Sequence, residues 1–246
     1  MLRNASTLFD EIRRCAGKEN CWGKMCLKHP KPVVLPCKQQ PKVMIITEQM
    51  NKSKKEKELE NVSKDWDPSK ELLDLIYEVK KGNKRIDIIL RLTNLFDGKF
   101  LEDFDDTQKS FNRFYWTHFI KCPGNLRDPE YDRSGLALYV CADTFLLREI
   151  EVLRPELIVC MGSLASTWIL KQTGLLNAKY KWLDLLLEEL EWAIKGETQI
   201  LERKIHGCGH KAKIVVLPHP SRRNPLAAVL NKKLKSLLKP FIDSLR

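Results

Sequence analysis

The sequence lacks any apolar run close to the ~18 residues that a membrane-spanning helix needs. Its first residues, MLRNASTLFDEIRR, mix acidic and basic side chains and contain no apolar core of a secretion signal. No glycine-, serine- or proline-rich stretch divides the 246-residue chain into two halves. These absences predict a single intracellular, cytoplasmic domain over residues 1–246, with no membrane partner.

The composition is that of an ordinary globular protein with enough apolar side chains for a core, at 43% hydrophobic and 30% charged residues. The 43 lysines and arginines exceed the 32 aspartates and glutamates, which gives a formal net charge of +11. Such a surplus favours a polyanionic partner such as nucleic acid, although many basic proteins bind no nucleic acid.

Four apolar segments have the length and composition of buried strands, and they span residues 41–49, 112–121, 156–162 and 213–217. Segments with helical spacing of apolar residues precede, separate and follow them, at residues 7–14, 69–81, 86–96, 133–153, 163–171, 182–194 and 225–246. This alternation implies right-handed crossovers between parallel strands. It predicts a three-layer α/β/α sandwich around a central four-stranded, mostly parallel sheet.

Polar or turn residues lie at the ends of these strands, where parallel sheets bind their ligands. They are Thr47-Glu48-Gln49, Thr117-His118 through Lys121-Cys122, Gly162-Ser163 and His219-Pro220-Ser221. Gly162-Ser163 is typical of an ordinary turn, whereas His219 lies between two prolines that stiffen its loop. The sequence therefore predicts a site at the carboxyl ends of the strands.

Several short motifs occur in an order that carries a family resemblance. They are EIRRC ending at Cys15, Cys26-Leu27, the strand ending in Thr47-Glu48, THFIKCP from Thr117, RPELIVCMGSLA from Arg154 and His219-Pro220-Ser221. Together they resemble the uracil-DNA glycosylase superfamily, and most closely its iron–sulfur-containing family 4, as a divergent member. The resemblance covers nearly the whole chain. It implies a monomeric DNA glycosylase of base excision repair that flips a deaminated base, such as uracil, out of DNA and leaves an abasic site.

The resemblance also assigns residue roles. Glu48 is the only acid at the end of the first strand, and it would activate water or stabilise the sugar cation. A helix-capping or surface glutamate is the alternative. His219 would donate a hydrogen bond to the departing base. Substrate contacts are expected from Thr47, Gln49, Asn51, Trp66, His118 and Ser221, with Trp66 as the stacking aromatic, and DNA contacts from Ser221, Arg222 and Arg223.

Three departures from the family pattern leave the substrate open. Thr47 replaces a glycine, Met50-Asn51 replaces Pro-Gly, and His118 replaces the asparagine that reads the uracil edge. A neutral imidazole matches the pyrimidine's donor and acceptor pattern only in a suitable tautomer. The alternative hypothesis is therefore a catalytically altered or inactive glycosylase-fold protein that binds nucleic acid.

Eight cysteines in an intracellular protein indicate metal ligands or core residues more than disulfides. The resemblance implies a structural [4Fe–4S] cluster held by Cys15, Cys26, Cys122 and Cys141, with Cys21 as an alternative to either N-terminal ligand. A zinc site made of Cys15, Cys21, Cys26 and Cys37 competes with it, and a redox or metal sensor is a third hypothesis. The HGCGH segment at residues 206–210 is interpreted as a turn between a helix and a strand.

Overall fold

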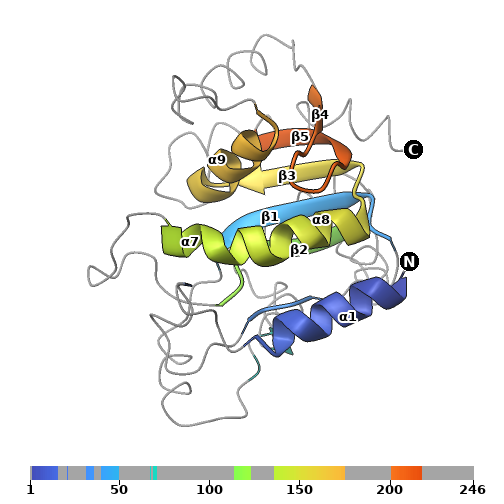
Figure 1. The fold of residues 1–246 in the computed structure, drawn as a ribbon, viewed down its shortest axis with the longest axis vertical. Coiled ribbons are helices and arrows are strands. Elements are labelled where there is room, and N and C mark those ends of the chain that lie inside the picture. The colour runs from blue at the N-terminus through green and yellow to red at the C-terminus, as the bar shows by residue number, and fades with distance from the viewer. Residues whose placement is uncertain are drawn as a thin grey trace, which may run out of the picture.

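The computed structural model describes residues 2–15, 21, 32–35, 40–49, 67, 69–70, 114–122, 136–174 and 201–217. Its centre is a five-stranded sheet with the order β2-β1-β3-β5-β4 (Figure 1). The strands are β1 (Val43–Gln49), β2 (Phe114–Ile120), β3 (Leu157–Met161), β4 (Leu201–Lys204) and β5 (Lys211–Leu217).

The four strands predicted from the sequence are β1, β2, β3 and β5, and they pair in parallel. The predicted α/β fold with a mostly parallel sheet is therefore confirmed. The fifth strand, β4, pairs antiparallel with β5 and was not predicted, because its sequence LERK holds a single apolar residue. The interpretation of HGCGH as a turn between a helix and a strand is accordingly wrong, since residues 206–208 turn between β4 and β5.

The described helices are α1 (Leu2–Arg13), α7 (Leu136–Cys141), α8 (Leu147–Leu153) and α9 (Ser163–Gln172), with one π-helical stretch, η2 (Ala142–Leu146), between α7 and α8. The helix predicted over 133–153 is thus described over residues 136–153, as a continuous helix with a wider turn in its middle. It ends where Arg154 takes a left-handed backbone conformation with φ 46°, directly before Pro155.

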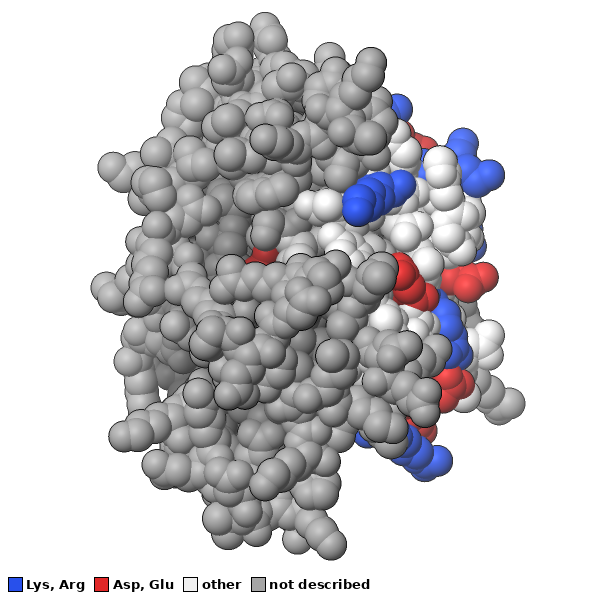
Figure 2. Space-filling view, turned by 60° about the vertical axis from the view of Figure 1, so that its left-hand side comes forward, with Lys and Arg blue, Asp and Glu red and all other residues white. Residues whose placement is uncertain are grey.

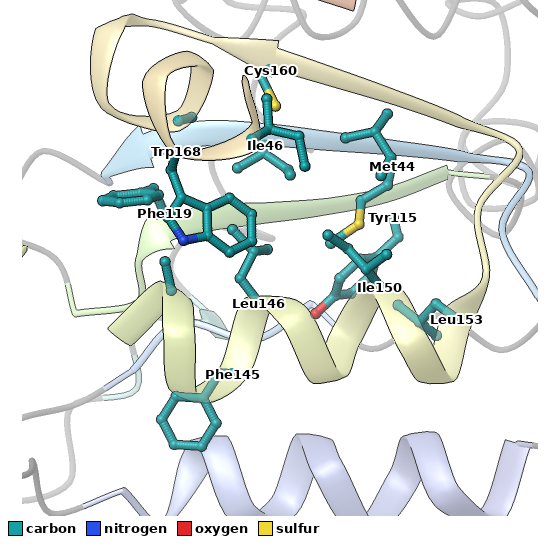
Figure 3. Close-up of a cluster of buried hydrophobic side chains, with 14 of the residues drawn as sticks. Met44, Ile46, Tyr115, Phe119, Phe145, Leu146, Ile150, Leu153, Cys160 and Trp168 are labelled. Atoms are coloured by element: carbon teal, nitrogen blue, oxygen red, sulfur yellow. The ribbon is translucent and has the colours of Figure 1, made fainter. Parts of the chain in front are cut away.

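The hydrophobic core lies between these helices and one face of the sheet (Figure 3). Alternate residues of the central strands point into it, as expected for a pleated sheet, and they include Met44, Ile46, Tyr115, Phe119 and Cys160. The helices contribute the facing side chains Leu146, Ile150, Leu153 and Trp168. The structure therefore describes the sheet and one helical layer of the predicted sandwich; the helices predicted over 86–96, 182–194 and 225–246 lie outside the described residues.

The helical layer also includes α1, which lies beside α8 (Figure 1). Phe9 of α1 stacks on Tyr115 of β2 with the ring centroids 5.6 Å apart. In the described part of the chain, no helix has the length and apolar character needed to cross a bilayer. On the face seen in Figure 2, the described residues carry lysine and arginine next to aspartate and glutamate, so this face is mixed in charge.

Candidate functional site

Glu48 lies at the end of β1 and reaches the first turn of α9. Its Oε1 atom accepts a hydrogen bond from the backbone N–H of Leu164 at 3.0 Å. The N-cap residue of α9 is Gly162, which offers no side-chain cap. A carboxylate is favourable there because the first N–H groups of a helix lack partners within the helix and carry partial positive charge. The contact predicted for a helix-capping glutamate is therefore present, and the catalytic role of Glu48 stays a prediction.

Thr47 and His118 lie side by side on the opposite face of the sheet. They are paired residues of β1 and β2, and side chains alternate between the two faces along each strand. Glu48 therefore points toward the helical layer described above, while Thr47 and His118 point away from it. The three predicted site residues share one end of the sheet but are divided between its faces.

Trp116 joins Thr47 and His118 and was not identified from the sequence. Its indole Nε1 donates a hydrogen bond to Thr47 Oγ1 at 3.0 Å, and its ring centroid lies 5.4 Å from that of His118. It occurs two residues before His118 in a strand, so both side chains share a face. That period-two spacing was the signal that could have identified it.

His118 is a buried, neutral imidazole. Only 2% of the residue is exposed. Burial lowers the pKa of His118 to about 3, and the positive charge of the nearby Lys121 lowers it further in the same direction. At neutral pH the ring therefore carries one N–H donor and one nitrogen acceptor rather than a positive charge.

Lys121 and Glu149 form a buried ion pair on the helical side of β2, and sequence reasoning missed it. Lys121 Nζ lies 2.6 Å from Glu149 Oε2, and both side chains are fully buried. Two further side chains of β2 donate to the same carboxylate, Tyr115 Oη at 2.7 Å and Thr117 Oγ1 at 3.3 Å. Lys121 Nζ also donates to Thr117 Oγ1. This network fixes the end of β2 against α8.

Three of the four predicted cluster ligands lie at the ends of different elements. Cys15 follows α1, Cys122 follows β2, and Cys141 ends α7. The backbone N–H of Lys121, the residue before Cys122, donates to Cys141 Sγ at 3.4 Å. Burial raises the pKa of Cys141 to about 11, and the neighbouring Cys15 contributes in the same direction. Cys141 therefore contacts the residue that directly precedes Cys122.

This donor set fits an iron–sulfur cluster in kind, because such clusters take thiolates from scattered loop positions. The fit is incomplete: the fourth predicted ligand, Cys26, lies outside the described residues. Among the residues that the structure does describe, no three histidine, cysteine or acidic side chains are grouped closely enough to hold a metal ion. The alternative ligand Cys21 is buried.

Other predicted site residues lie outside the described part of the chain. They are Asn51, Trp66, His219, Ser221, Arg222 and Arg223. Gln49 is described by its backbone alone, as the last residue of β1. Their assignments stay predictions.

Comparison with known proteins gives two findings. Residues 36–243 match the family model described as the uracil DNA glycosylase superfamily. The chain belongs to this superfamily. Within it, the chain is similar to the type-4 uracil-DNA glycosylase of Archaeoglobus fulgidus, with 31% identity over 108 residues. That alignment covers 44% of this chain and 44% of the relative, so the chain spans less than half of the length of this curated relative.

The superfamily match places several features of the site inside the shared region. All five strands, Glu48 and His118 lie within residues 36–243, whereas α1 and Cys15 precede them. The resemblance predicted from the ordered motifs is therefore confirmed at the level of the superfamily.

Proposed function

We propose that this protein is a monofunctional DNA glycosylase of base excision repair, which hydrolyses the N-glycosidic bond of a deaminated base, uracil, and leaves an abasic site. Membership of the superfamily and similarity to a type-4 uracil-DNA glycosylase support this proposal. The observation that carries it is an acid, Glu48, held by a hydrogen bond at the strand end where parallel sheets bind ligands. No lysine is assigned as a Schiff-base nucleophile, so strand cleavage is not expected.

In this mechanism Glu48 acts on the sugar side of the bond that breaks. As the bond lengthens, positive charge develops on the sugar, and a carboxylate stabilises it and orients the attacking water. The hydrogen bond from Leu164 N–H orients the carboxylate before the substrate binds. His219 acts on the base side, where its donated hydrogen bond strengthens as negative charge develops on the base.

His118 contacts the edge of the flipped base as a neutral donor and acceptor. Its lowered pKa keeps the ring neutral throughout the physiological range, so recognition by this residue does not depend on its ionisation. Thr47, Gln49 and Asn51 line the same pocket, and Trp66 stacks on the base. Ser221, Arg222 and Arg223 grip the DNA backbone or groove beside the flipped nucleotide. We infer that the protein acts as a monomer.

The predicted cluster is structural in this proposal. Cys15, Cys26, Cys122 and Cys141 would hold it, and a bound [4Fe–4S] group would cross-link four thiolates that come from separate segments. The chain's own contribution is the hydrogen bond from the backbone N–H of Lys121, the residue before Cys122, to Cys141 Sγ. Iron and sulfide analysis of the purified protein tests this assignment, and four irons per chain are expected. Zinc in their place would select the competing site.

The activity is tested with labelled oligonucleotides that contain uracil, hypoxanthine or a mismatch, followed by alkali. Uracil-containing strands are expected to break only after alkali. Glu48→Gln should lower the single-turnover rate about 100- to 1,000-fold, the range for removal of one stabilising group, with little change in affinity for the oligonucleotide. Glu202→Gln, at an exposed position of β4, is the matched control. No product from any of the three oligonucleotides would reject the catalytic proposal.

A second candidate function is nucleic-acid binding without catalysis. It is favoured by His118, which is nearly fully buried and replaces the asparagine of the family. Tight binding of duplexes with no turnover, unaffected by Glu48→Ala, would select this function over the first.

A further inference from the structure

Gly162 occupies the junction between β3 and α9. It directly follows Met161, the last residue of β3, and is the N-cap residue of α9, with φ 99° and ψ 166°. A positive φ of this size is unfavourable for residues with a Cβ atom but costs glycine little. Glycine therefore has a conformational reason to be here, and the surroundings give a second one.

The carboxyl group of Glu48 fills the space that a side chain at position 162 would occupy. A Cβ atom built on Gly162 would lie 2.6 Å from both Cδ and Oε1 of Glu48. These are the carboxyl atoms whose position the hydrogen bond from Leu164 N–H defines. Glu48 thus rests directly on the backbone of Gly162, and any larger residue there would push the carboxylate away from α9.

The backbone of Gly162 cannot easily move aside, because it is held on both sides. Its N–H donates to the carbonyl oxygen of Leu217 at 2.9 Å, and its carbonyl oxygen accepts from Ser166 N at 3.1 Å. Leu217 is the last residue of β5, two residues before His219. Gly162 is therefore hydrogen-bonded to the strand that leads to His219, and it also contacts Glu48.

We propose that Gly162 is a positioning residue for the reaction, which sets the Glu48 carboxylate against α9 and in register with the end of β5. This inference rests on the proposed function, because it gives Glu48 its catalytic role. It assigns to the Gly162-Ser163 turn a task beyond the ordinary turn predicted from the sequence. Gly162 itself touches no substrate; it acts through Glu48.

The proposal is tested with Gly162→Ala and the matched control Gly174→Ala. Gly174 follows α9, also has a positive φ, of 69°, and faces His206 rather than Glu48. Both variants carry backbone strain, but only Gly162→Ala displaces the carboxylate. Its single-turnover rate on a uracil oligonucleotide should fall about as far as that of Glu48→Gln, about 100-fold or more, while the dissociation constant stays within about threefold. Gly174→Ala should keep the wild-type rate.

A double-mutant cycle separates positioning from general damage to the fold. If Gly162 acts through Glu48, the variant Gly162→Ala/Glu48→Gln should be no slower than Glu48→Gln alone. If the rate losses of the two single variants multiplied in the double variant, the proposal would be overturned. The rates therefore report coupling between these two residues, which a merely structural role of Gly162 would not produce.

A second cycle, in urea unfolding, needs no activity. Gly162→Ala should lower the urea midpoint more in the wild-type background than in Glu48→Ala, because the smaller side chain removes the clash and leaves only the strain. Equal shifts in the two backgrounds would overturn the proposed contact. If the midpoint shift of Gly162→Ala differs between the two backgrounds but Glu48→Gln keeps the wild-type rate, the contact stands and the catalytic role of Glu48 fails. The two failures are thereby distinguished.

Discussion

His118 of β2 and Lys121, the residue after the strand, are both buried, but their surroundings favour opposite charge states. Lys121 faces the helices, where Glu149 lies 2.6 Å from its ammonium group. His118 faces the other side, where burial lowers its pKa to about 3. Burial by itself disfavours charge, and charge persists only where the fold supplies a counter-charge. One face of the strand end thus carries a fixed ion pair, and the other a neutral hydrogen-bonding group.

The largest expected effect comes from removing the counter-charge. Glu149→Leu leaves the buried ammonium of Lys121 without its carboxylate, and it should lower the free energy of unfolding by about 3–5 kcal/mol, the range for breaking one side of a buried pair. Urea unfolding followed by circular dichroism measures it. The double variant Lys121→Met/Glu149→Leu removes both charges.

The double variant should recover most of that loss, because an apolar pair of similar size avoids the desolvation of two charges. Tyr115 and Thr117 then lose an acceptor, so full recovery is not expected. If both variants were equally unstable, the role of Glu149 would lie in packing and the contrast with His118 would lose its electrostatic basis.

A change of pH tests whether the buried His118 stays neutral. Below pH ~6.5 the unfolded chain protonates His118, whereas the folded ring resists protonation until its pKa of about 3. The unfolded state therefore binds more protons, and stability falls as the pH falls through this window. The contribution of His118 should be about 2 kcal/mol smaller at pH 5 than at neutral pH, since one pKa unit corresponds to about 1.4 kcal/mol.

A comparison of the wild type with a variant that lacks the imidazole separates the contribution of His118 from those of the other titrating groups. The pH dependence of unfolding in His118→Asn should be flatter than in the wild type between pH 6.5 and 4. His206→Asn, at an exposed turn position, is the control for the replacement of a histidine by asparagine. A wild-type slope that persists in His118→Asn would show that the imidazole is not held neutral.

The strands differ in how far the sequence alone could predict them. Continuous apolar runs such as LIVCM of β3 predict buried parallel strands because both faces of such a sheet are covered. The four-residue strand β4 lacks that signal, since its pairing depends on β5, a neighbour along the folded sheet. Local patterns therefore predicted the parallel strands and missed the edge strand.

Prediction of the site was limited by partners that are distant in sequence. Glu48 was predicted as the acid near the end of β1, but its contact with Leu164 crosses 116 positions in the sequence. Likewise, Lys121 was read only as part of a motif, because its partner Glu149 lies on a helix 28 residues later. Residue type indicates which chemistry is available, and only the fold determines which groups meet.

The smallest predicted effect tests the neutral face through the hydrogen bond from Trp116 Nε1 to Thr47 Oγ1. Thr47→Val keeps the shape of the side chain but leaves the buried indole N–H without this acceptor, so it should cost about 1–2 kcal/mol in the free energy of unfolding. Removing both partners in Thr47→Val/Trp116→Phe should show coupling, because the second substitution takes away the unpaired donor. Strictly additive losses would mean that this hydrogen bond does not organise the face that holds His118. Coupling would mean that neutral hydrogen bonds maintain this face, as the ion pair maintains the other.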